Sequence, residues 1–198
     1  MKRISLSVLT SSFALAAAMA TGSAASAQVF TPTFMGPASS GDVGVYVSEA
    51  AGGTAIEGIW RQRASSYDLG LRAGFIDAGD GALSVGAEIR SPLHVQSEPI
   101  SLALTAGAQG VFGGGNAIGI QGGITAGHTF VPGPFTLSPY VHPRIALSRP
   151  LGDGGDFGAH VLADLGVDLG FQPNLAVRFN VGLSSHGPDW GLGLAFRR

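Results

Sequence analysis

An alternation of apolar and small or polar residues constrains the fold of this chain more than any other feature. It is clearest between residues 175 and 184, where every second position is leucine, valine or phenylalanine. After a short turn the pattern resumes at residues 190–196 and runs almost to the last residue. Successive side chains of a β-strand point to opposite faces. This stretch therefore predicts a hairpin with one apolar face and one face of small or polar residues.

The same alternation recurs from residue 43 onward and predicts a chain built almost wholly of strands. After residue 27 no stretch approaches 18 consecutive apolar residues, which excludes a membrane-spanning helix. Glycine is abundant, which disfavours helices, and glycine, proline and aspartate separate the alternating segments. We predict ten strands, near residues 43–47, 56–63, 67–75, 83–90, 100–109, 118–127, 135–147, 160–169, 175–184 and 190–196.

The spacing of these strands favours an all-β, antiparallel up-and-down barrel. Residues 43 to 196 give about 15 residues for each strand with its connection, which suits membrane-crossing strands of roughly 9 to 11 residues. A barrel of eight strands is the alternative. Pro139 and Pro143 interrupt the seventh strand, and because proline cannot donate to a ladder, we expect a bulge, a bend or a missing bond there.

The amino terminus resembles an export signal. Lys2 and Arg3 precede an apolar run at residues 8–20, and Ala25, Ser26 and Ala27 are small residues suited to cleavage. We predict a signal peptide at residues 1–27 removed after Ala27, a periplasmic leader at 28–42 and an outer-membrane barrel at 43–198. An uncleaved membrane anchor is the alternative for the first segment, which is short for a bilayer span.

Composition narrows the class further. Without residues 1–27 the chain keeps nine arginines, no lysine and thirteen acids, a formal charge of −4, which gives no indication of nucleic-acid binding. The chain has no cysteine, so an exported domain of this size must be held by its ladder and packing. His94 and His160 have no metal-ligand spacing, and His128 is expected at the membrane interface near a girdle. We predict neither a metal nor a cofactor.

The residues of the polar register decide which face is outside. The positions between the charged residues are mostly Gly, Ser, Thr and Gln. The side chains of this face are therefore smaller and less often charged than those on the water-facing surface of a soluble protein. We therefore expect the polar face to line the lumen, with five basic and five acidic residues forming a charge network. The predicted network consists of Glu57, Arg61, Asp68, Arg72, Glu88, Arg90, Arg144, Asp164, Asp168 and Arg178.

Aromatic residues near the predicted strand ends support an apolar face turned toward lipid. Two aromatic girdles flanking an aliphatic band are typical of outer-membrane barrels. The residues concerned are Trp60, Tyr67, Phe75, Phe112, Phe130, Phe135, Phe157, Phe171, Trp190 and Phe196.

With these features the chain resembles the small bacterial outer-membrane β-barrel proteins, the broad group that includes the OmpA, OmpX and OmpW types. The resemblance covers almost all of the chain after the signal, and it implies outer-membrane lipid, lipopolysaccharide and the barrel-assembly machinery as partners. It also implies that the final strand, with Trp190, Leu192, Leu194 and Phe196, is the assembly signal. Here two arginines follow Phe196, whereas members of the group typically end on the aromatic residue.

Two hypotheses for the lumen follow from its charges. Paired charges would plug and stiffen a narrow monomeric barrel with a structural or surface-interaction role. Alternatively, they would line a small passive diffusion pore. With both termini periplasmic, acidic residues gather at the outer connections and could bridge divalent cations or lipopolysaccharide, although aspartate beside glycine is also ordinary turn chemistry. These acids are Glu49, Asp77, Asp80, Asp153, Asp156 and Asp189, against a single base, Arg149.

An enzyme, such as a lipid-modifying one, is a further class to weigh. A nucleophile, a base and an acid could meet at the last outer turn or within the seventh strand. The sequence lacks the His-x-Ser order expected of outer-membrane lipid A deacylases and the Asp-x-His pair of omptin proteases. We therefore predict no catalytic residues. The candidates considered are Ser184, Ser185, His186 and Asp189, and Ser138 with His142.

Overall fold

The computed structural model describes residues 32–37, 41–50, 53–77, 79–93, 99–113, 116–152, 156–172, 174–184 and 187–197. The predicted signal peptide at residues 1–27 lies outside these ranges, as do His94, Asp153, Ser185 and His186. Within them, no helix is long and apolar enough to cross a membrane.

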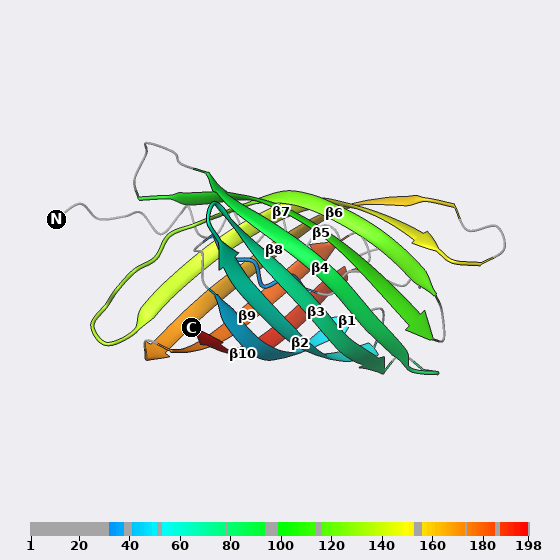
Figure 1. The fold of residues 1–198 in the computed structure, drawn as a ribbon, viewed down its shortest axis with the longest axis horizontal. Coiled ribbons are helices and arrows are strands. Elements are labelled where there is room, and N and C mark those ends of the chain that lie inside the picture. Colours follow the sequence, from blue (N-terminus) through cyan, green and yellow to red (C-terminus); the bar gives the residue numbers. More distant parts are fainter. Residues whose placement is uncertain are drawn as a thin grey trace.

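Ten antiparallel strands form a closed barrel in which each strand pairs with the next and β1 pairs with β10 (Figure 1). The predicted all-β, up-and-down barrel of ten strands is confirmed, and the eight-strand alternative is wrong. Closure leaves no free sheet edge. The strands are β1 Asp42–Ala50, β2 Gly53–Ala64, β3 Tyr67–Asp77, β4 Ala82–Leu93, β5 Ser101–Gly113, β6 Ala117–Gly127, β7 Thr136–Pro150, β8 Gly158–Gln172, β9 Leu175–Ser184 and β10 Gly187–Arg197.

The two faces of the sheet have the predicted orientation. Apolar side chains point outward, among them Val45, Ile120 and Leu194, which are 60%, 58% and 43% exposed. Nine of the ten predicted girdle aromatics are exposed, and Trp60 is half-buried. Polar and charged side chains of the other register are buried in the interior. This inside-out pattern is the one expected of a barrel surrounded by lipid.

Some strands begin or end at residues other than those predicted. β1 begins one residue earlier than predicted, at Asp42, and β10 begins at Gly187 rather than near Trp190. Of the acids assigned to outer connections, Glu49, Asp77 and Asp189 therefore lie within strands, as does Arg149. Asp80 and Asp156 remain in connections.

The prolines of β7 interrupt the ladder on one side only. The β6–β7 pairing runs to Gly123 opposite Arg144 and resumes at Ala126 opposite Val141, so the pairs between them are missing. The β7–β8 pairing is continuous through Pro139 and Pro143. The predicted missing bond is thus confirmed on the β6 side.

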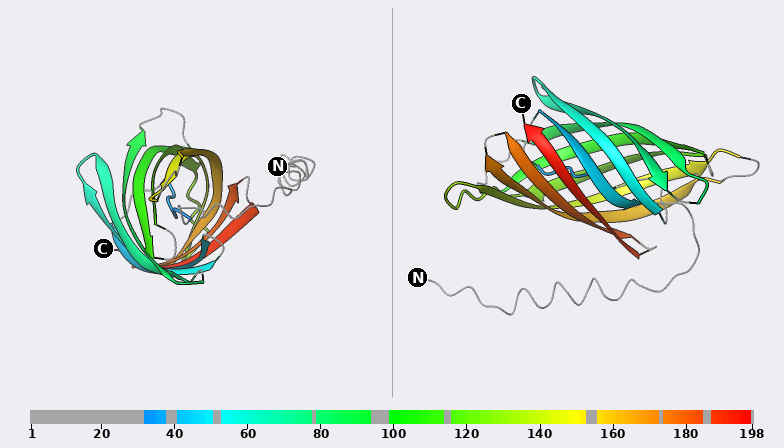
Figure 2. Two further views of the ribbon diagram at one scale, coloured as in Figure 1. Left: turned by 90° about the vertical axis from the view of Figure 1, so that its right-hand side faces the viewer. Right: turned by 90° about the horizontal axis from the view of Figure 1, so that it is seen from below.

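Residues 32–37, which belong to the predicted periplasmic leader at 28–42, lie inside the barrel. In the end-on view of Figure 2 this segment, drawn in blue, passes through the ring of strands. All six residues are buried, and Thr33, Phe34 and Met35 are 0%, 1% and 3% exposed. The alternation of the sequence gives no signal for such a segment, because its backbone finds its partners among side chains of the lumen rather than in the ladder.

A cluster of buried apolar side chains lies in the interior toward the other end of the barrel. Its members come from the ends of β2 to β8 that lie away from Asp42 and Arg197, the residues where the barrel begins and ends. The larger side chains are Ile76, Val111 and Leu162, and the cluster consists of Ala55, Ile76, Ala82, Val111, Ala117, Ala146 and Leu162. We call this set the apolar cap. The buried charges therefore gather toward the termini, whereas the opposite end holds the apolar cap together with buried serines such as Ser48 and Ser148.

Candidate functional site in the barrel lumen

The structure places all ten residues of the predicted charge network in the barrel interior, each at most 9% exposed. It adds Asp42, the first residue of β1, which is 0% exposed. Among the described residues, six buried carboxylates thus share the lumen with five buried guanidinium groups. Buried charges are tolerated only when they are paired and hydrogen-bonded, so the contacts of each group decide what the lumen can do.

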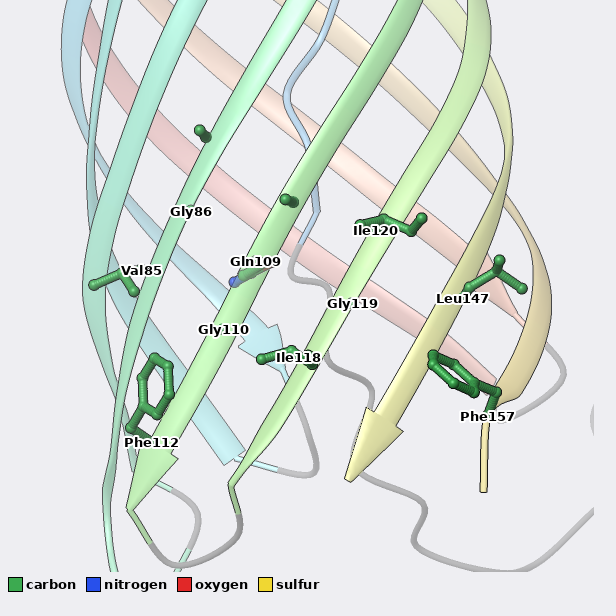
Figure 3. A pocket seen from close by; sticks show the side chains of 12 residues that line it. Val85, Gly86, Gln109, Gly110, Phe112, Ile118, Gly119, Ile120, Leu147 and Phe157 are labelled. Atoms are coloured by element: carbon green, nitrogen blue, oxygen red, sulfur yellow. The ribbon is translucent and has the colours of Figure 1, made fainter. Parts of the chain in front are cut away.

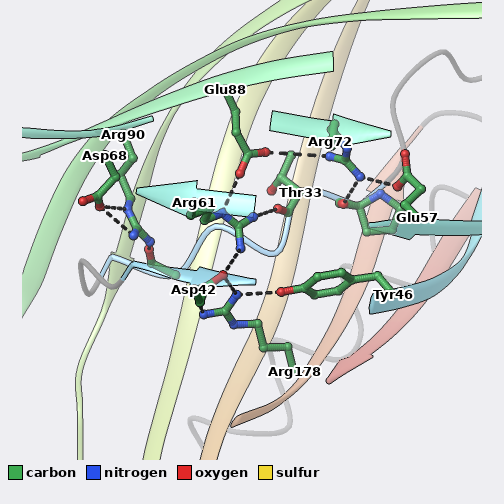
Figure 4. Close-up of polar contacts among 12 residues, drawn as sticks. Thr33, Asp42, Tyr46, Glu57, Arg61, Asp68, Arg72, Glu88, Arg90 and Arg178 are labelled. Atoms are coloured by element: carbon green, nitrogen blue, oxygen red, sulfur yellow. Dashed lines mark hydrogen bonds and ion pairs between the residues drawn. The ribbon is translucent and has the colours of Figure 1, made fainter. Parts of the chain in front are cut away.

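Arg178 on β9 is the most connected of these groups (Figure 4). Its Nε donates to Asp168 Oδ2 at 3.1 Å on the neighbouring strand β8, directly opposite in register. Its terminal nitrogens reach past β10 to β1, where Nη2 lies 2.6 Å from Asp42 Oδ2 and Nη1 donates to Tyr46 Oη at 2.7 Å. Asp164, which lies on the same neighbouring strand, pairs with Arg144 instead.

A second set of pairs joins β1 to β4. Arg61 Nε donates to Glu88 Oε1 at 2.6 Å, and Arg61 Nη1 lies 3.7 Å from Asp42 Oδ1. Arg72 Nη2 donates to Glu57 Oε2 at 2.5 Å. Asp42 therefore stands between Arg61 and Arg178 and links the two halves of the network.

Two bidentate arrangements complete the network. Arg90 donates from Nε and Nη2 to Asp68 Oδ2 at 2.9 and 2.7 Å, across the β3–β4 pair. Arg144 on β7 donates from Nε and Nη2 to the two oxygens of Asp164 on β8, both at 3.1 Å. Forked contacts of this kind hold both partners in a fixed geometry.

Residues 32–37 are bound by the same arginines through their backbone carbonyls. Arg72 Nη2 donates to the carbonyl of Pro32 at 3.2 Å and Arg61 Nη2 to that of Thr33 at 2.9 Å. Arg90 Nη1 donates to the carbonyl of Gly36. Each of these arginines thus binds a carboxylate and a carbonyl, so the segment is an integral part of the charge network. We call residues 32–37 the lumen segment.

Thr33 also joins His142 and Asp164 on the far wall. Its hydroxyl donates to Asp164 Oδ2 at 2.8 Å and lies 2.9 Å from His142 Nδ1. Because the only hydroxyl proton goes to the carboxylate, Nδ1 must carry the proton that Thr33 accepts. His142 Nε2 lies 2.7 Å from Thr105 Oγ1, so both ring nitrogens are engaged.

Phe34 fixes the lumen segment by packing. Its ring centroid lies 4.5 Å from that of Tyr46, and Phe34 adopts a φ of 51°, a left-handed conformation that is uncommon for a bulky residue. Two glycines of β10 make the space. A Cβ at Gly191 would come within 2.4 Å of Phe34 Cζ, and one at Gly193 within 2.0 Å of Tyr46 Cδ1. The small face of the last strand therefore seats both aromatic rings.

Sequence reasoning missed Asp42, Thr33 and the role of Tyr46. Tyr46 stands on the polar register of β1, which is a signal that it faces the lumen. Asp42 lies one residue before the alternation becomes visible, and Thr33 lies in a segment without periodicity. No pattern in the sequence marks either of them.

The residues considered for catalysis have other partners where they are described. Ser138 Oγ lies 2.9 Å from Thr129 Oγ1, and His142 is occupied by Thr33 and Thr105. Ser184 Oγ donates to the carbonyl of Gly187 at 3.0 Å.

In the described part of the chain, no group of three or more histidine, aspartate or glutamate side chains could hold a metal ion. His128 Nδ1 contacts the carbonyl of Pro99.

The residues of the predicted assembly signal share the outer face of β10. Trp190, Leu192, Leu194 and Phe196 are 44%, 48%, 43% and 53% exposed. Their position on the outer wall leaves them accessible to lipid or to another protein during insertion. Their role in assembly remains a prediction.

No family model matches the chain, and no curated protein matches it. Among solved structures it is similar to a KdgM porin, at 8% identity and a TM-score of 0.42 over 78% of this chain and 98% of that one. It is also similar to a KdgM porin in complex with disordered oligogalacturonate, at 9% identity and a TM-score of 0.42 over 78% and 98%. A third is the N-terminal β-barrel domain of Pseudomonas aeruginosa OprF, at 11% identity and a TM-score of 0.35 over 80% and 97%.

The classification rests on the barrel itself. Its ladder closes between β1 and β10, its outer wall is apolar, and its charges are gathered inside. Only a closed barrel lets strands cross a bilayer with every backbone group satisfied. The chain folds as a closed antiparallel β-barrel with an apolar outer wall and a charged interior, the architecture of barrels that span a membrane.

Proposed function

We propose that this protein is a monomeric outer-membrane barrel with a closed lumen and a structural or surface-interaction role. The observation that carries the proposal is the lumen segment, whose six buried residues lie within the charge network. A conducting pore needs a continuous path of water, and the buried side chains and backbone of the lumen segment occupy part of the space where such a path would run.

Two further features support closure. The guanidinium groups of the lumen are bound by carboxylates and by carbonyls of the lumen segment, so an ion entering would have to displace strong charge-assisted contacts. Toward the opposite end of the barrel, the apolar cap places the side chains of Ile76, Val111 and Leu162 in the interior. Apolar constrictions oppose conduction by dewetting.

The alternative function is a narrow diffusion pore, and one observation favours it. The lumen segment is absent from the strand ladder among the described residues, and it is held by side chains from several strands. If it left the barrel, the charge-lined space around it would become accessible to small ions.

Conductance in planar bilayers distinguishes the two functions. We expect the mature chain, starting at Gln28, to give no steady steps. Voltage-independent steps from this protein would overturn the closed-lumen proposal and favour the pore.

A variant opened on purpose shows whether the assay can detect a lumen. Deleting residues 28–37 and replacing Ile76 and Leu162 by serine removes the lumen segment and the two largest side chains of the apolar cap. We expect steps from this variant. Heat-modifiable migration in gels should verify that it has kept the barrel.

A further inference from the structure

A groove on the outer wall of the barrel has features of a lipid-binding site. It has a volume of about 610 Å³ and lies over β4, β5, β6 and β7 (Figure 3). This volume is in the range of small-molecule sites in proteins. The groove lies toward the connections β5–β6 and β7–β8, at the end of the barrel opposite to Asp42 and Arg197.

The strand register explains why a groove forms at this place. Two outward-facing rows cross the sheet, and in register order they are Val85, Gly110, Ile118 and Arg149, and below them Ala87, Ala108, Ile120 and Leu147. Small residues on β4 and β5 thus stand beside branched residues on β6. The step in side-chain size makes a floor at Ala87 and Ala108 with a wall at Ile118 and Ile120.

Two aromatic residues bound the groove toward the barrel end. Phe112 on β5 is 41% exposed, and Phe157 before β8 is 71% exposed. Figure 3 shows Phe112 on the β4 side and Phe157 on the β7 side of the row of isoleucines. Aromatic side chains at this level mark the boundary between the apolar band and the headgroup region.

A cation stands beside this aromatic boundary. The guanidinium carbon of Arg149 lies 5.2 Å from the ring centroid of Phe157, and Arg149 follows Ile118 in the outward row. A cation on the outer wall of a barrel is costly within the apolar band but favourable at the level of anionic headgroups. The groove therefore has an apolar floor with a positively charged side chain at one end.

We propose that this groove binds lipid A of the outer leaflet, with an acyl chain over Ala87 and Ala108 and a phosphate beside Arg149. The polarity of the groove matches a lipid whose chains are apolar and whose head is a phosphorylated sugar. The choice of leaflet follows from the expectation that both termini are periplasmic. The proposal concerns the outer wall and does not depend on whether the lumen conducts.

Native mass spectrometry of the detergent-solubilised protein tests the proposal, with diphosphorylated lipid A as the probe. Ala108→Leu fills the floor of the groove and should weaken lipid A binding roughly tenfold, the effect of about two lost methylene contacts. Arg149→Gln should weaken it about fivefold, the effect of one cation at a membrane surface.

Matched controls separate the groove from the rest of the wall. Ala106→Leu adds the same bulk to the same face of β5, one step outside the groove, and Arg63→Gln removes an exposed arginine at the other end of the barrel. Both should bind lipid A as the parent chain does. Equal binding by all five proteins would overturn the proposal. Equal retention of phosphatidylglycerol and lipid A would overturn the assignment to lipid A.

Discussion

Arg178 Nη2 on β9 lies 2.6 Å from Asp42 Oδ2 on β1, although β10 separates the two strands in the sheet. The contact therefore crosses the lumen side of the closing strand and joins the first strand to the penultimate one. Both side chains are almost fully buried, at 0% and 3% exposure. Removing Asp42 leaves Arg178 with Asp168 as its remaining carboxylate, and removing Arg178 leaves Asp42 with Arg61 at 3.7 Å.

Asp42→Ala should destabilise the barrel by about 1.5 to 3 kcal/mol, because Arg178 and Arg61 each lose one of their two buried carboxylates and keep the other. The free energy of unfolding can be measured by guanidinium titration in detergent micelles. Asp77→Ala, at the exposed end of β3, is the control and should change stability by less than about 0.5 kcal/mol. Identical midpoints for both variants would contradict the linking role of Asp42.

Arg178→Glu should be more severe than Asp42→Ala, because it places a third carboxylate beside Asp42 and Asp168. We expect loss of the heat-modifiable folded band in gels. Arg178→Gln keeps hydrogen-bond donors without the added repulsion and should retain a folded but weakened barrel. If Arg178→Glu folds as stably as Arg178→Gln, repulsion within this cluster is not important.

Phe196→Ala should mainly impair insertion into the outer membrane and leave the stability of the inserted barrel little changed. The side chain is 53% exposed on the outer wall, so its loss creates no cavity. The measurement is the share of protein in the outer-membrane fraction after expression. Phe179→Ala, also an outward aromatic but in mid-strand, is the matched control. Normal insertion of Phe196→Ala would show that the assembly signal lies elsewhere.

Gly191→Leu should expel the lumen segment, because any side chain there collides with the ring of Phe34. The chain has no cysteine, so Met35→Cys provides a single reporter. In the parent barrel this position is 3% exposed and should resist a maleimide reagent. Adding Gly191→Leu should make it react.

The control for this experiment is Gly58→Leu, an outward glycine where a Cβ would meet only the carbonyl of Ala73 at 3.8 Å. It should leave Met35→Cys protected. Rapid labelling in the parent barrel would mean that the lumen segment exchanges with solvent, which would favour the pore function.

The regular part of the molecule could be predicted from sequence because each face of a strand meets one environment along its whole length. Leu192 and Leu194 meet lipid while Gly191 and Gly193 meet the lumen, and the period of two records this directly. The same register placed Arg61 and Arg178 inside. Even the interruption at Pro143 could be anticipated from the missing amide proton.

The partners within the lumen could not be predicted in the same way. Asp42 meets Arg178 only because β1 pairs with β10, and no short turn in the sequence sets that register. Thr33 and Phe34 lie in a segment that borrows its hydrogen bonds from side chains on several strands. Such contacts form only when the barrel has closed, and they therefore produce no local pattern in the sequence.

The glycines that seat Phe34 and Tyr46 belong to the last strand, while the rings themselves belong to the beginning of the barrel sequence. During export the amino-terminal residues emerge first, yet their binding place does not exist until the final strand is paired. A partly assembled sheet would therefore hold water where the closed barrel holds Phe34. Pairing of the final strand therefore completes the wall and buries Phe34 in the same step, so the interior takes its final form only after the last strand has been exported.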